Sequence, residues 1–106
     1  MEIVDQIAAI PLFQGLQRPQ LEELAMIIVA QKIKRGQIIF AEGDAGTGFY
    51  VLTAGRVKIF KLSPEGKEQI LHIMPSGEPF GEVAVFAGEP FPAYAEAIED
   101  GYTLFF

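Results

Sequence analysis

The residues best suited to bind a ligand lie in one stretch, residues 80–97, which opens with Phe80, Gly81 and Glu82. A glycine turn followed by one turn of helix leaves backbone N–H groups without partners, and such groups favour anions or polar ligands. The carboxylate of Glu82 beside this turn could accept hydrogen bonds from a ligand hydroxyl. It could equally do no more than cap the helical turn, and the stretch alone favours neither interpretation decisively.

A second candidate site involves His72, the one histidine of the chain, which falls in a predicted strand over residues 67–74. Side chains two residues apart on a strand share a face, so His72 should lie beside Ile70 and Met74. A histidine and a methionine together could ligate haem iron, which makes His72 and Met74 candidate haem ligands. The alternative is a partly exposed strand histidine next to a methionine of the core.

Composition excludes several classes of function. The 106 residues include no cysteine, so a disulfide framework, a thiolate metal site and an iron–sulfur cluster are ruled out within this sequence. One histidine cannot provide the histidine and carboxylate set of metal-dependent jelly-roll enzymes, and no catalytic triad is available, so we expect no enzymatic activity.

The net charge of -6 argues against direct binding of nucleic acid by these residues. No apolar run is long enough for a membrane span and no signal sequence opens the chain, so we expect a cytoplasmic protein without membrane contact.

The elements that must position these residues follow from periodicity. Residues 2–9 read as a short helix, and a second helix starts at Pro19 with a core-facing stripe. That stripe consists of Leu21, Leu24, Ala25 and Ile28. Seven short strands with turn residues between them are predicted at 32–35, 37–41, 49–53, 56–62, 67–74, 93–98 and 102–106. Residues 63–66 and the pair Asp100-Gly101 read as hairpin turns, so the pattern predicts a mainly β sandwich or barrel.

Four segments then resemble a known family in their order and approximate spacing. They are residues 42–44, 49–52, 55–59 and 80–82. Together they resemble the cyclic-nucleotide-binding domain, and more narrowly the sensor half of Crp/Fnr-type bacterial transcription regulators. The resemblance implies an eight-stranded double-stranded β-helix, or jelly roll, flanked by short N-terminal helices. It also implies that Gly43, Gly55 and Gly81 occupy tight turns, where a side chain is costly.

The resemblance also implies an organisation for the whole protein. Residues 1–106 would form one sensor domain, with a helical part over 1–30 and the jelly roll over 31–106. Relatives that bind DNA continue into a dimerisation helix and a helix-turn-helix domain. We therefore expect a fragment of a longer homodimer that binds DNA through the missing part and couples effector binding to it. The alternatives are a regulatory module of a kinase, channel or transporter, and a haem-based gas sensor.

One departure from the family pattern changes the expected ligand. In cyclic-nucleotide binders, the turn after the Gly-Glu pair continues with proline, an arginine that pairs with the cyclic phosphate, and serine or threonine. Here Phe91 stands at the position of the arginine, and Pro92 at that of the hydroxyl residue. A phosphate would lose a bidentate charged partner and an N–H donor. At roughly 1.5–3 kcal/mol for each such bond, cAMP and cGMP should bind ~100-fold or more weakly, so neither is expected as a cofactor.

The expected effector pocket is apolar with one polar group. It comprises Phe80, Gly81, Glu82, Val83, Phe91, Pro92 and Ala93. Such a pocket suits an uncharged or aromatic small molecule, and it equally suits a pocket that is simply filled and senses nothing.

Overall fold

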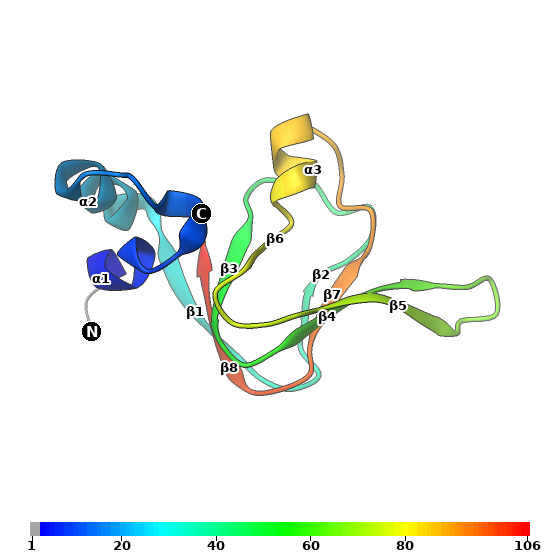
Figure 1. Ribbon diagram of the computed structural model, residues 1–106. Helices are drawn as coiled ribbons and strands as arrows, with labels where there is room; N and C mark the ends of the chain where they lie inside the picture. Colours follow the sequence, from blue (N-terminus) through cyan, green and yellow to red (C-terminus); the bar gives the residue numbers. More distant parts are fainter. Residues whose placement is uncertain (1–2) are drawn as a thin grey trace.

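The protein folds into a jelly roll of two four-stranded sheets with helices at one end (Figure 1). The computed structural model describes residues 3–106, so Glu2, the predicted first residue of the first helix, lies outside the described residues. The helices are α1 (Ile3–Ala8), the 3-10 turn η1 (Pro11–Phe13), α2 (Arg18–Ile27) and α3 (Glu82–Ala87). The strands are β1 (Val29–Ile33), β2 (Ile38–Phe40), β3 (Tyr50–Ala54), β4 (Val57–Leu62), β5 (Glu68–Met74), β6 (Pro79–Phe80), β7 (Tyr94–Ala97) and β8 (Gly101–Phe105).

Both sheets are antiparallel, and their strand order is that of a jelly roll. One sheet has the order β1-β8-β3-β6 and the other has the order β2-β7-β4-β5. The predicted mainly β jelly roll with short helices is therefore confirmed. The strand missed by the sequence pattern is β6, because it has only 2 residues and begins with a proline, which marks turns more often than strands.

One predicted hairpin and the bounds of the first strand, β1, were wrong. Asp100-Gly101 does not close a hairpin, because β7 and β8 belong to different sheets. The turn at Gly55 is present as predicted, and it too leads from one sheet to the other, between β3 and β4. These turns carry the chain from sheet to sheet and touch each other: a side chain on Gly55 would start 2.9 Å from the backbone oxygen of Asp100. Residues 34 and 35 leave the predicted first strand because a turn begins there, in which the Gln37 N–H donates to the Lys34 carbonyl.

The strand β3 is buried on both faces at its centre. Val51 and Leu52 are adjacent in β3 and each is fully buried, because successive strand residues point to opposite faces. Val51 packs in a core with the N-terminal helices, which includes Ile7, Leu21 and Ile28. Leu52 packs in a second core between the two sheets, around Phe40 and Phe80. The predicted stripe of α2 is confirmed, since all four of its residues pack in the helical core.

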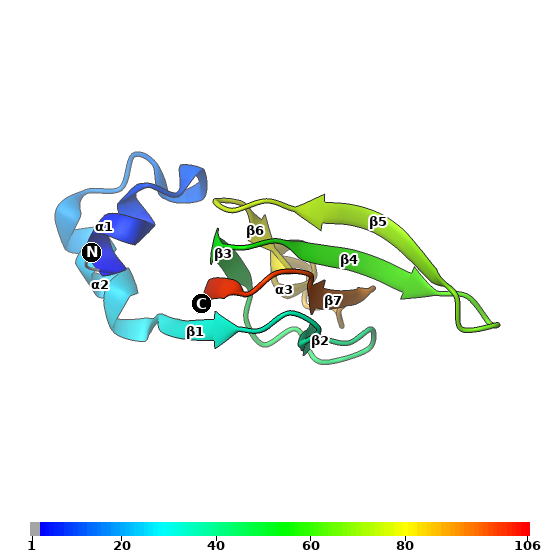
Figure 2. The ribbon, with the colours of Figure 1, turned by 90° about the horizontal axis from the view of Figure 1, so that it is seen from below.

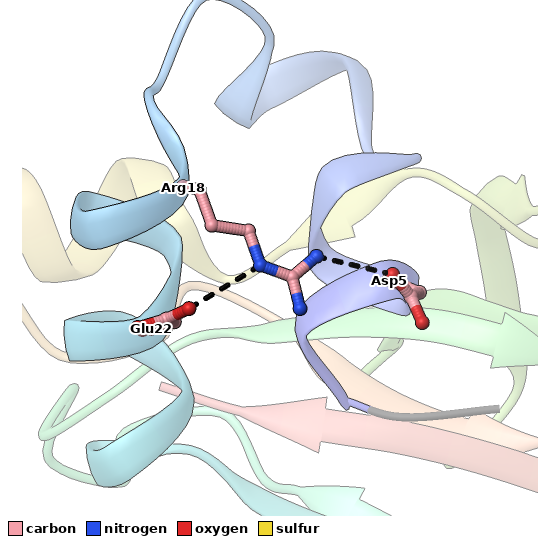
Figure 3. A network of polar contacts seen from close by, with 3 residues as sticks. All are labelled: Asp5, Arg18 and Glu22. Atoms are coloured by element: carbon pink, nitrogen blue, oxygen red, sulfur yellow. Dashed lines mark hydrogen bonds and ion pairs between the residues drawn. The ribbon is translucent and has the colours of Figure 1, made fainter.

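Surface charges tie the two N-terminal helices together. Arg18, the first residue of α2, lies between Asp5 of α1 and Glu22 one turn further along α2 (Figure 3). Its Nη1 is 3.5 Å from Asp5 Oδ1 and its Nε is 3.3 Å from Glu22 Oε1. All three side chains are exposed, so these ion pairs contribute at most about 1 kcal/mol each, and the apolar contacts determine how the helices pack.

The β4–β5 hairpin projects from the opposite end of the molecule to α1 and α2 (Figures 1 and 2). The predicted turn over residues 63–66 is confirmed, since β4 and β5 pair along their length. A bulge interrupts the pairing: His72 lies opposite Ile59, whereas Ile70 lies opposite Phe60. Neighbouring positions on β4 face opposite sides, so the predicted common face for Ile70 and His72 is wrong, while that for His72 and Met74 holds.

Candidate functional site

A cavity of about 310 Å³ opens between α3, the strands β4 to β6 and the segment that follows α3. All seven residues of the expected effector pocket line it: Phe80, Gly81, Glu82, Val83, Phe91, Pro92 and Ala93. Val83 does so from the rim, because α3 turns its side chain outward and leaves it 75% exposed. The geometry thus gathers these residues around one space, and their binding of an effector stays a prediction.

Aromatic rings form one wall of the cavity. Phe91 is 4% exposed and stacks on Phe40, with ring centroids 3.9 Å apart and planes 13° apart. Phe40 also contacts Phe80, which stacks in turn on Tyr50. The residue at the arginine position of the family motif is thus part of the core, where its ring both fills space and lines the cavity.

Gly81 is required for this arrangement in two ways. Its φ of 83° is in the left-handed region, where it begins α3 as the N-cap residue. A Cβ at this position would also lie 3.0 Å from Cε1 of Phe91. Any side chain here would therefore strain the backbone and displace the stacked ring. Gly43 and Gly55, which were also expected in turns, have φ of 91° each.

Glu82 is the first residue of α3 and not its cap, because Gly81 holds the N-cap position without any side-chain cap bond. Glu82 is half-buried, and its carboxylate has no hydrogen-bond or ion-pair partner within residues 3–106. Glu89 lies beyond the other end of the helix, is exposed and lines the same cavity, and its carboxylate is also unpaired in that range. The side chains around the cavity therefore include two carboxylates, one imidazole and no lysine or arginine.

His72 and Met74 both line the cavity from β5. Met74 belongs to the core between the sheets, whereas His72 is exposed opposite Ile59. A haem site at this pair stays a prediction. In the described part of the chain, no group of three or more His, Cys, Asp or Glu residues is arranged to hold a metal ion.

Sequence reasoning missed six lining residues, which are Phe40, Ile59, Pro79, Ala84, Glu89 and Pro90. Phe40 and Ile59 come from strands far from residues 80–97 in the sequence, so only the folded sheets bring them to the cavity. The position of Glu89 could have been predicted from Gly88. This glycine has a left-handed conformation that ends α3 and turns the chain back. A glycine followed by glutamate and proline is typical of a turn, and that pattern alone does not assign the carboxylate of Glu89 to the pocket.

Two titratable groups near the site have shifted pKa values. Burial raises the pKa of Tyr50, and the negative charge of Asp44 adds to the effect. On the outer face of β4, a hydrogen bond to Glu68 raises the pKa of Lys58, and Glu96, 3.7 Å away, supports the charged form. Lys58 also lies over the ring of Phe60, 5.0 Å from its centroid.

The match to known proteins agrees with this geometry. The family model described as the cyclic nucleotide-binding domain matches residues 30–106, and the chain belongs to this family. Its fold and motifs make it a sensor-type domain that resembles those of Crp/Fnr regulators. The sensor domain of the transcriptional regulator DNR from Pseudomonas aeruginosa superposes with a TM-score of 0.90 and 31% identity, covering 100% of this chain and 74% of that chain.

The relatives include more than one class of protein, with transcription regulators and protein kinases among them. The CRP-like cAMP-activated global transcriptional regulator of Mycobacterium tuberculosis is 32% identical over 94 residues, which is 89% of this chain and 42% of that protein. A cGMP-dependent protein kinase of Toxoplasma gondii is 33% identical over 88% of this chain and 9% of its own length. The chain thus spans less than half of either protein.

Across the described residues, every helix falls short of the length and hydrophobicity that a membrane span requires.

Proposed function

We propose that this domain is the effector-sensing part of a Crp/Fnr-type transcription regulator, and that its effector is neither cAMP nor cGMP. The rest of such a regulator would be a dimerisation helix and a helix-turn-helix domain, acting as a homodimer on DNA in the cytoplasm. Effector binding would change the affinity of that part for DNA, which requires the effector to bind the two states unequally.

The observation that carries the exclusion of cyclic nucleotides is the position of Phe91. Its ring is stacked 3.9 Å from Phe40 inside the core, so no cation stands where the family motif places one. The cavity offers no other lysine or arginine to replace it. A cyclic phosphate would give up its water without gaining a charged partner, and burial of an unpaired ion costs several kcal/mol.

The direct test is a calorimetric titration with both nucleotides. We expect no binding in the micromolar range, because losing two charge-assisted bonds weakens affinity by ~100-fold or more. A low-micromolar dissociation constant for either nucleotide would refute the proposal.

A gain-of-function variant tests the physical reason. Phe91→Arg combined with Pro92→Ser restores the arginine and hydroxyl of the family motif, and should improve nucleotide binding by about tenfold or more. The matched control is Phe86→Arg, which adds the same charge on the outward face of α3 at a side chain that is 71% exposed. Circular dichroism shows first that both variants are folded. Equal nucleotide affinity in the two variants would show that the position of the cation is irrelevant.

A further inference from the structure

The charges around the cavity indicate what kind of effector it takes. Glu82 begins α3, the exposed Glu89 lies two residues beyond its end, and both line the cavity. The one other titratable side chain in the lining is His72. With a neutral imidazole, the lining carries two negative charges and no positive one. Neither carboxylate has an ion-pair or hydrogen-bond partner in residues 3–106.

An anionic effector would be repelled by this site. A neutral apolar effector would fit the aromatic wall, but it would cover the half-buried Glu82 carboxylate and remove its water without supplying a donor. A carboxylate that loses water and gains no partner is strongly unfavourable. An effector with an ammonium group avoids both problems, because it donates charge-assisted hydrogen bonds to carboxylates.

The remaining lining selects for an apolar body. Phe80, Phe91, Met74 and Pro92 provide hydrophobic and aromatic surface, and aromatic rings also attract nearby cations. The volume of about 310 Å³ is at the low end for ligand cavities, which suits a small molecule.

We propose that the effector is a small organic amine, with its apolar body against the aromatic wall and its ammonium group at Glu82, while the exposed Glu89 adds to the negative charge of the cavity mouth. This inference rests on the proposed function and names the chemical class of the effector. In the family motif, the glutamate is expected to bind a neutral hydroxyl of the ligand. In this chain, Phe91 replaces the arginine of the motif, so Glu82 has no neighbouring cation and can bind a positively charged group of the ligand.

Three probes of nearly equal shape and different charge test the inference: 2-phenylethylamine, 2-phenylethanol and phenylacetate. Each is titrated into the whole chain, and binding is followed by the amide chemical shifts of residues around the cavity. We expect the amine to bind about tenfold or more tightly than the alcohol, and the carboxylate to bind most weakly.

Variants locate the ammonium group. Glu82→Gln should weaken amine binding by about three- to tenfold and leave the alcohol unaffected, because it keeps the shape and removes one charge. Glu89→Gln should weaken amine binding less, because Glu89 is exposed and water screens its charge. The control is Glu65→Gln, in the turn between β4 and β5 and outside the cavity lining, which should change neither affinity.

Equal affinity for the three probes, tighter binding of phenylacetate, or no shift at the cavity with any of them would overturn the amine inference. Those outcomes leave the exclusion of cyclic nucleotides intact, because that exclusion is measured separately with cAMP and cGMP. Micromolar binding of a cyclic nucleotide would instead overturn the proposed function itself.

Discussion

Replacing Phe91 by alanine tests whether its ring is a structural part of the core. The ring is 4% exposed, stacks on Phe40 at 3.9 Å and lies against the backbone of Gly81. Removing a buried phenylalanine side chain costs about 3–5 kcal/mol. Because this ring also lines a cavity that is open to solvent, water can enter the space left behind, and we expect about 3 kcal/mol, at the lower end of that range.

The assay is urea unfolding followed by circular dichroism, since the chain has no tryptophan to report by fluorescence. In thermal unfolding followed by the same signal, a loss of about 3 kcal/mol should lower the melting temperature by about 12 °C or more, at roughly 4–8 °C for each kcal/mol in a domain of this size. Domains have about 5–15 kcal/mol of stability, so the variant should remain folded enough to measure.

Phe86→Ala is the matched control, because it removes the same side chain from the exposed face of α3. We expect it to change stability by less than about 1 kcal/mol. If Phe91→Ala cost no more than Phe86→Ala, the ring would not be packed as described, and the physical basis for excluding cyclic nucleotides would be lost.

Two further predictions concern polar groups. Thr103 is fully buried and its hydroxyl is unpaired among the described residues, so Thr103→Val should leave stability unchanged or raise it by about 1–2 kcal/mol in urea unfolding. Thr53→Val, which removes a donor to the Tyr102 carbonyl, should lower it by about 1 kcal/mol instead, and the same loss in both variants would contradict this reasoning. The raised pKa of Lys58 means that its pairing with Glu68 stabilises the fold fully below the unfolded pKa of about 10.5. This contribution disappears as the pH rises through the higher folded pKa. The stability difference between the wild type and Lys58→Met should therefore be constant from neutral pH to about pH 10 and shrink above it, and a constant difference at more alkaline pH would show that the pairing is not responsible.

Local patterns were sufficient for the fold class, because helical and strand periodicities reflect which face of each element is buried. Strand pairing was harder to predict from the sequence. A turn such as Asp100-Gly101 has the same chemistry whether it closes a hairpin or leads to another sheet. Here Asp100 accepts a hydrogen bond from the N–H of Arg35, 65 positions earlier in the chain, and such a partner is invisible in a short window.

The candidate site was predictable where the residues are consecutive. Residues 80–82 and 91–93 reach the cavity together because one short helix and its two flanking glycines turn the chain around the same space. The second carboxylate of the site was not predicted, because the sequence around Glu89 is typical of a turn and does not show that the turn borders the cavity. Val83 was expected among the residues that line the pocket, and it lies at the rim of the cavity. Consecutive residues of a helix point in different directions, so the Val83 side chain points more toward solvent than that of Glu82.

The strand β3 has a practical consequence for redesigning what the domain recognises. Val51 and Leu52 are neighbours in β3 but pack in different cores. The strand β3 is therefore shared by the core under the N-terminal helices and the core beside the cavity. A library restricted to residues that face the cavity would miss the side chains of the helical core, such as Val51, that also hold β3 in place. Substitutions at Val51, beneath the helices and out of reach of any effector, are therefore good candidates for tuning ligand preference from a distance.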